Sequence, residues 1–290
     1  MRMAALNRYA TPTAFRRALE DRLKLLANAE GLDLQRLLRE VAFDRLLARL
    51  FAKTDAPWVL KGGYAMELRI KEARATKDID LALRQAIGQG RGRPLNRDIL
   101  AELQEAAGRD LGDFFSYAIG EAVQDLGGAP YGGARFPVQA RMDARTFVKF
   151  HVDVGVGDMF LTPLEMIEGS DWLKFAGIRP AKCPTISEEQ HFAEKLHAYT
   201  LPRQAPNSRT RDLVDMVLLI GRNLDKKKVA ADIAATFQRR KTHAVPSKLE
   251  PPPSAWERPF ALLAVECGLP PDIEAAFSVL NEFFITLGLQ

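Results

Sequence analysis

The stretch from Trp58 to Leu83 constrains the fold most, because it places a glycine turn and two acidic residues between apolar runs. Trp58–Leu60 is typical of a short buried strand, and Lys61-Gly62-Gly63 interrupts that run. Tyr64–Arg69 predicts one or two helical turns, and Asp78–Leu83 predicts a second strand. The stretch therefore predicts a strand, a glycine turn, a short helix and another strand.

Asp78 and Asp80 are the candidate ligands of this unit, because residues two apart in a strand share a face. The residues between and after them, Ile79, Leu81 and Leu83, then face a core. Two adjacent carboxylates repel each other unless a cation lies between them, and oxygen ligands suit Mg²⁺. The backbone of Gly62 and Gly63 can approach phosphate at a helix start. Each feature alone is common on exposed strands and turns, but together they indicate a site for a metal and a triphosphate.

Composition limits the class of protein. The chain has 290 residues, of which 47% are hydrophobic, so we expect one large core or two packed ones. Its formal charge of +4 permits nucleic-acid binding without requiring it. Two distant cysteines indicate no disulfide framework. The absence of a signal peptide and of a long apolar run predicts a cytoplasmic protein without a membrane partner.

The order of the patterns predicts an α+β fold. Helices over residues 14–29, with Thr13 as the N-cap, and from Asp33 to about residue 53 would brace the sheet. Residues 135–142 and 146–154 alternate as strands. From Ser187 onward the chain reads as nearly all helix, so we expect a sheet domain over residues 1–180 and a helical domain over residues 181–290. The arginines of the loop after Leu83 (Arg84, Arg91, Arg93 and Arg97) fit a solvated loop and a phosphate contact equally well.

Two helices in the second half carry further candidates. Ser187 and Gln190 resemble the start of a capped helix, on which Lys195 lies off the apolar stripe. A lysine of this kind is ordinarily solvated, but near a triphosphate it acts as a point charge. Asp212 and Asp215 share a face of the next helix, because residues three apart are neighbours. Asp215 is the favoured partner of Lys195, and Asp212 pairs with it or with Arg209 or Arg211 on the surface.

These motifs resemble the AbiEii family of bacterial toxins, which includes the MenT toxins, within the nucleotidyltransferase fold superfamily. The resemblance covers the glycine turn with Asp78 and Asp80, the pair Gln190 and Lys195, and the pair Asp212 and Asp215. Many nucleotidyltransferases have Gly-Ser in the turn, where this chain has Gly62-Gly63. The resemblance implies a nucleotidyltransferase-like mixed sheet flanked by helices, followed by a helical half that completes the active site.

The resemblance also implies a third acid on a neighbouring strand. Asp153 fits that position, at the end of a strand that carries Lys149 and His151 on the same face, and Asp158 is a weaker alternative. The implied catalytic set comprises Asp78, Asp80, Asp153, Lys195 and Asp215. The first three would hold one or two Mg²⁺ ions. The implied nucleotide-binding set comprises Lys61, Gly62, Gly63, Gln190, Lys195 and Asp212.

The implied activity is transfer of a nucleoside monophosphate from an NTP to the 3′ end of a tRNA, which would block translation, with a cognate antitoxin as partner. One alternative is a nucleotidyltransferase of the antibiotic-modifying type with a small acceptor. Another is a nucleotide-binding module without activity. Thr76, two residues before Asp78, is a candidate regulatory phosphorylation site, because a phosphate there adds a charge of about −1.5 to −2 beside the triphosphate.

Overall fold

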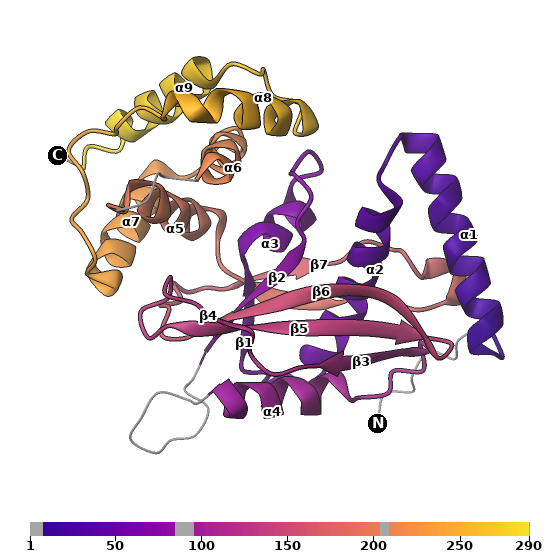
Figure 1. Cartoon of the computed structure of the whole chain (residues 1–290). Helices are drawn as coiled ribbons and strands as arrows, with labels where there is room; N and C mark the ends of the chain where they lie inside the picture. Colours follow the sequence, from indigo (N-terminus) through magenta and orange to yellow (C-terminus); the bar gives the residue numbers. More distant parts are fainter. Residues whose placement is uncertain (1–7, 85–95, 204–208, 290) are drawn as a thin grey trace. The chain divides into compact units, whose positions relative to one another are not determined.

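The computed structural model describes residues 8–84, 96–203 and 209–289, which form two compact units (Figure 1). Unit 1 comprises Met1–Leu68, Ala75–Asp158 and Met166–Thr185. Unit 2 comprises Arg69–Arg74, Met159–Glu165 and Ile186–Gln290. Arg91 and Arg93 of the predicted arginine loop lie outside the described residues. Unit 2 thus takes two short segments from within the sheet-forming part of the chain.

Unit 1 is built on a mixed sheet with the strand order β3-β5-β6-β2-β1-β8-β7, in which β4 pairs with β5. β2 runs parallel to β6, and β1 runs parallel to β8, whereas β1 with β2, β5 with β6 and β3 with β5 are antiparallel. The strands are β1 (Trp58–Lys61), β2 (Asp78–Leu83), β3 (Phe115–Ile119), β4 (Gln124–Asp125), β5 (Gly133–Met142), β6 (Arg145–Gly155), β7 (Glu165–Glu168) and β8 (Lys182–Thr185).

One face of this sheet packs on helices, and this burial follows from the alternation of apolar residues. Ile79 and Leu81 of β2 and Val152 and Val154 of β6 are fully buried, as the strand pattern predicts. α2 (Leu34–Leu50) packs against β6, and α4 (Asn96–Ala107) packs against β3. Together with α1 (Pro12–Glu30) and α3 (Gly62–Arg69), these helices confirm the predicted class of a mixed sheet flanked by helices.

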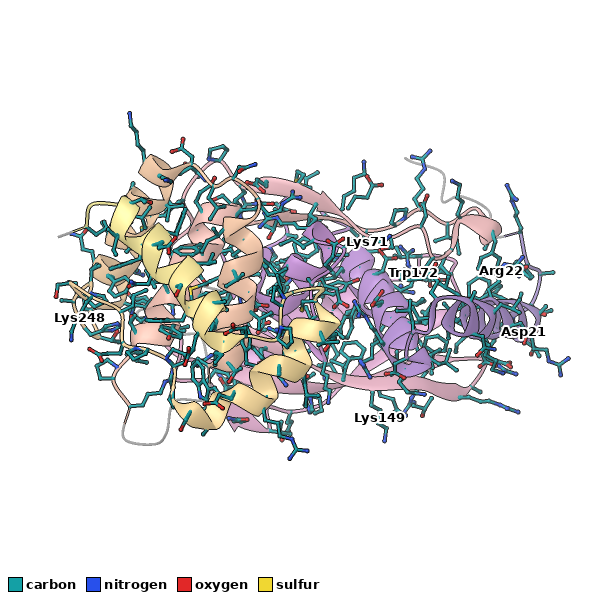
Figure 2. The ribbon with its side chains drawn as sticks, turned by 90° about the horizontal axis from the view of Figure 1, so that it is seen from above. Asp21, Arg22, Lys71, Lys149, Trp172 and Lys248 are labelled. Atoms are coloured by element: carbon teal, nitrogen blue, oxygen red, sulfur yellow. The ribbon has the colours of Figure 1, made fainter. Side chains whose placement is uncertain are left out.

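The helix starts follow local capping. α2 begins after Asp33, whose carboxylate accepts from the Gln35 N–H, as predicted. The predicted cap of α1 is wrong by two residues: the N-cap is Thr11, and the Thr13 hydroxyl instead donates to Asp143. At the same end of unit 1, the Arg22 guanidinium lies 4.3 Å from the centre of the Phe175 ring, and Trp172 packs on the small core under α1 (Figure 2).

Unit 2 is a helical bundle with an apolar core of its own. Its helices are α5 (Glu188–Thr200), α6 (Thr210–Ile220), α7 (Lys226–Arg240), α8 (Glu257–Glu266) and α9 (Ile273–Thr286). α5 packs on α6 and α7, and α6 packs on α8 and α9. Ser187 caps α5 and accepts from the Gln190 N–H, as predicted. Within the described part of the chain, no helix is both long and apolar enough to cross a membrane.

Candidate active site

The glycine turn lies directly beside Asp80, because antiparallel pairing of β1 and β2 places Lys61 opposite that residue. Gly62 has φ +67°, and a Cβ built on it would overlap the Asp80 side chain. The Gly63 N–H donates to Oδ2 of Asp80 at 3.3 Å. The carboxylate therefore lies at the N-terminus of α3, where the helix dipole favours negative charge. Glycine at position 62 is required both by its backbone angle and by this close approach.

The register of β2 and β6 brings the three predicted acids onto one face of the sheet. Asp80 lies opposite Asp153, and Asp78 lies opposite His151. All four residues are partly exposed, whereas their neighbours along both strands are buried. The structure thus brings Asp78, Asp80 and Asp153 together on adjacent strands in unit 1.

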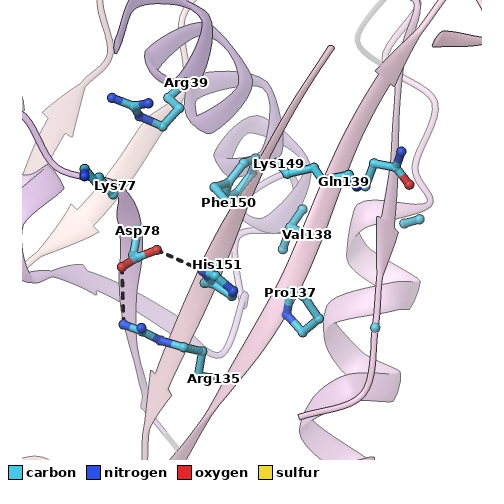
Figure 3. Close-up of a pocket in the computed structure, with 12 residues that line it drawn as sticks. Arg39, Lys77, Asp78, Arg135, Pro137, Val138, Gln139, Lys149, Phe150 and His151 are labelled. Carbon is cyan, nitrogen blue, oxygen red and sulfur yellow. Dashed lines mark hydrogen bonds and ion pairs between the residues drawn. The ribbon is translucent and has the colours of Figure 1, made fainter. Parts of the chain in front are cut away.

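Arg135 links these acids and was not singled out from the sequence. It lies on β5 directly opposite Asp153. Its Nε is 2.7 Å from Oδ1 of Asp153, its Nη2 is 2.8 Å from Oδ2 of Asp153, and Nη2 is also 3.2 Å from Oδ2 of Asp78 (Figure 3). His151 Nδ1 lies 3.3 Å from the other oxygen of Asp78. The hydrogen bonds that Arg135 donates to the Asp153 carboxylate raise the pKa of its guanidinium. Arg135 therefore offsets the repulsion between two carboxylates.

Lys61 and Asp158, both named from the sequence, form an ion pair with each other. The Asp158 carboxylate is 3% exposed and the Lys61 side chain is 15% exposed. This pairing leaves Asp158 a structural partner of Lys61 rather than a member of the acid row on β2 and β6.

The donor chemistry of Asp78, Asp80 and Asp153 suits a hard cation such as Mg²⁺, because all three supply carboxylate oxygens. Across residues 8–84, 96–203 and 209–289, no group of three His, Cys, Asp or Glu side chains is arranged to hold a metal ion. The ion pairs that Arg135 makes with Asp78 and Asp153 are consistent with that finding.

The predicted lysine of the helical half lies in a buried charge cluster of unit 2. Lys195 is 7% exposed, and its Nζ lies 2.6 Å from Oδ2 of Asp215 and 3.4 Å from Oδ1 of Asp212. Arg74 donates to both oxygens of Asp215, at 3.1 and 2.9 Å. Arg209 is 3.4 Å from the second oxygen of Asp212. Asp215 is thus held by two cations, of which the sequence indicated only the lysine.

Opposing effects set the pKa values in this cluster. Burial lowers the pKa of Lys195, but the carboxylates of Asp215 and Asp212 outweigh burial and raise it. Burial raises the pKa of Asp215, but Lys195 and Arg74 outweigh burial and lower it. Both Lys195 and Asp215 are therefore charged at neutral pH, and Lys195 is a fixed ammonium rather than a solvated one.

Gln190 has a bracing role in the same unit. Its Nε2 donates to the Met159 carbonyl at 2.7 Å, and its Oε1 accepts from the Leu161 N–H at 3.0 Å. Since the side chain is 2% exposed, both ends of the amide are used by the backbone of the segment at residues 159–165. The predicted nucleotide contact of Gln190 stays a prediction.

Thr76 lies in the approach to β2. Its N–H donates to Glu67 Oε2 at 3.1 Å, and its hydroxyl donates to the Asp78 carbonyl at 3.3 Å. The residue is partly exposed.

The glycine turn and the acids on two parallel strands define the chain as a nucleotidyltransferase by fold. The chain is similar to MenT4, a nucleotidyltransferase toxin from Mycobacterium tuberculosis, with 19% identity, coverage of 92% of this chain and 99% of that chain, and a TM-score of 0.54. A family model for the nucleotidyl transferase AbiEii toxin of type IV toxin–antitoxin systems matches residues 45–276. The chain therefore belongs to the AbiEii nucleotidyltransferase toxin family, as the sequence motifs predicted.

The chain is also similar to a solved H. pylori protein of the nucleotidyltransferase type, with 13% identity, coverage of 88% of this chain and 96% of that chain, and a TM-score of 0.46. No curated protein matches the chain. Membership of a nucleotidyltransferase toxin family of toxin–antitoxin systems implies an NTP substrate and an antitoxin.

Proposed function

We propose that this toxin is metal-dependent and transfers a nucleoside monophosphate from an NTP to the 3′ end of a tRNA, which blocks translation. The observation that carries the proposal is the row of Asp78, Asp80 and Asp153 on adjacent strands beside the Gly62-Gly63 turn. Carboxylates that lie side by side on adjacent strands, next to a glycine turn, suit a metal-bound triphosphate. Modification of an acceptor on which translation depends, such as the tRNA 3′ end, would account for growth arrest by such a toxin.

In the proposed reaction, an acceptor hydroxyl attacks the α-phosphorus of the NTP, a new P–O bond forms, and the bond to the β-phosphate breaks to release pyrophosphate. The backbone of Gly62 and Gly63 positions phosphate oxygens, and Asp153 accepts the proton of the attacking hydroxyl. Lys195 neutralises charge on the leaving pyrophosphate, with Asp215 and Asp212 fixing the ammonium. Asp78, Asp80 and Asp153 would hold one or two Mg²⁺ ions, which supply charge neutralisation and a lower pKa for the attacking hydroxyl.

Incubation of the protein with each α-labelled NTP, Mg²⁺ and either total tRNA or aminoglycosides tests this proposal. We expect label on the tRNA 3′ end, loss of labelling by Asp80→Asn, and loss of labelling in EDTA. Label on the aminoglycoside would instead support the antibiotic-modifying alternative. Growth arrest that persists in Asp80→Ala would support the binding-module alternative and contradict the enzymatic proposal.

We also propose that phosphorylation of Thr76 silences the enzyme. Its hydroxyl lies 3.3 Å from the Asp78 carbonyl, so a phosphate there adds about −1.5 to −2 charge next to the acid row. After co-expression with the antitoxin, mass spectrometry should find the phosphate on Thr76 and on no residue of Thr76→Ala. A phosphate located elsewhere would contradict this assignment.

A further inference from the structure

A cationic groove of about 790 Å³ opens beside Asp78 on the face of the sheet that carries the acids (Figure 3). Its walls come from β3, β5 and β6 and from α2. The ionisable side chains that line it are Arg39, Lys77, Asp78, Arg135, Lys149 and His151. We call this feature the acceptor groove.

Among the described residues, two of its cations are either outside any ion pair or paired only at long distance. Lys149 is exposed on β6, forms no ion pair with any described residue, and projects outward from the sheet (Figure 2). Arg39 has only a distant acid, Asp33, at 3.9 Å. Its Nε is buried without a hydrogen-bond acceptor among the described residues. The Arg39 side chain is 16% exposed and lines the groove, so its weakly compensated charge can attract an anion there.

The groove and the glycine turn lie at different places along the row of acids. The turn lies beside Asp80, whereas the groove opens at Asp78 and continues over β6 and β5. In phosphoryl transfer the attacking and leaving oxygens are roughly in line on opposite sides of the phosphorus. If the triphosphate is bound at the turn, the groove therefore lies where the attacking acceptor enters.

The chemistry of the groove identifies the class of acceptor. Besides Asp78, the lining holds four permanently basic side chains, which favour a polyanion and oppose a polycationic acceptor such as an aminoglycoside. Pro137 is the partly exposed apolar residue of the lining, whereas Val138 and Phe150 belong to the core beneath it. Spaced cations along a groove that can contact successive phosphates are typical of sites for single-stranded nucleic acid.

We propose that the acceptor groove binds the single-stranded 3′ end of an RNA acceptor, with its phosphates on Arg39 and Lys149 and its terminal hydroxyl directed to Asp78. This inference rests on the proposed nucleotidyl transfer and adds the place and direction of acceptor binding. It assigns to Arg39 and Lys149 a role in acceptor affinity that is separate from the binding of NTP.

The test compares the double variant Arg39→Gln/Lys149→Gln with a matched control, Arg17→Gln/Lys24→Gln, in the full chain. Both control residues are exposed on α1, outside the groove, and removing them changes the net charge equally. Fluorescence anisotropy measures the Kd of a labelled single-stranded RNA 3′ end without NTP. A separate titration with NTP, without RNA, measures the nucleotide affinity of each variant.

We expect the groove variant to raise the Kd for RNA about tenfold, and to lower the slope of log Kd against log salt by about 0.7 for each lost phosphate contact. Its NTP affinity and the RNA affinity of the control should match those of the unmodified chain. Equal RNA affinity of the groove variant and the control would overturn the inference, even where label transfer to RNA is observed. Specific weakening in the groove variant without any label transfer would leave the RNA site standing and contradict the proposed activity.

Discussion

Substitution of Gly62 by alanine separates a general backbone effect from a specific effect on the acid row. Gly62 and Gly31 both have φ +67°, but they differ in their surroundings. A Cβ on Gly31 would meet nothing within 4 Å. A Cβ on Gly62 would lie only 2.0 Å from Oδ2, 2.4 Å from Cγ and 2.6 Å from Cβ of Asp80. A new rotamer of Asp80 cannot remove the overlap, because the Cβ atom of Asp80 is itself involved.

The expected costs follow from these differences. Alanine in the left-handed region costs about 1–2 kcal/mol at either position. At Gly62 the displaced Asp80 adds an off-rotamer cost of about 0.5–1.5 kcal/mol. Loss of the hydrogen bond from the Gly63 N–H adds about 1–3 kcal/mol. We therefore expect Gly62→Ala to lower the free energy of unfolding by about 1.5–4.5 kcal/mol more than Gly31→Ala does. Displacement of Asp80 by about 1 Å should also lower kcat/KM about 100-fold.

Urea unfolding and NTP-dependent labelling of the acceptor, measured on both variants, check this prediction. Gly31→Ala should lose stability and keep its activity per folded molecule. The double variant Gly62→Ala/Asp80→Gly should recover part of the stability that Gly62→Ala loses, because the side chain that clashes is gone, but it should recover no activity. Equal stability of the two single variants, or full activity of Gly62→Ala, would refute the reasoning about the turn.

Three further predictions concern charged groups. Asp215→Asn should lower the free energy of unfolding by about 3–5 kcal/mol, because it removes the buried carboxylate that Lys195 and Arg74 share. Lys195→Met should cost less, because the Arg74 guanidinium still binds the Asp215 carboxylate. The pKa of Asp215 is lowered in the folded chain, so its stabilisation is present above its unfolded pKa and is lost in acid. The free energy of urea unfolding should therefore change less with pH in the acidic range in Asp215→Asn than in the unmodified chain. An unchanged pH dependence would contradict this assignment. Burial and the Glu40 carboxylate raise the pKa of Glu67 from 4.5 to about 8, so the free energy of unfolding should fall as pH rises between these values. Thermal unfolding of Glu67→Gln should not show that fall. A variant with the same pH profile as the unmodified chain would disprove this prediction. Arg135→Gln removes the cation that binds two acids, so it should tighten Mn²⁺ binding in titration calorimetry, and weaker binding would count against the acid row as the metal site.

Local sequence patterns were sufficient to predict most helices and strands and the face of the sheet on which Asp78 and Asp80 lie. The alternation in residues 78–83 correctly placed Asp78 and Asp80 on one face and Ile79 and Leu81 in the core, because strand geometry fixes which side chains share a face. Ser187 was correctly identified as a helix start, because capping depends on neighbours three residues away. The short strands β8 and β7, of which β7 lies at the sheet edge, carry no such pattern and were not predicted.

The partners of the charged groups were not readable from the sequence, because pairing depends on strand register and on packing between distant segments. Arg135 reaches Asp153 only because β5 and β6 pair in one particular register. Arg74 reaches Asp215 across 141 positions in the chain, and Gln190 uses its amide on the backbone of Met159. The sequence by itself determined the family, most of the elements and the face on which the acids lie. Only the tertiary structure decided which cations hold those acids, since a periodic pattern records the side on which a residue lies but not what lies opposite it.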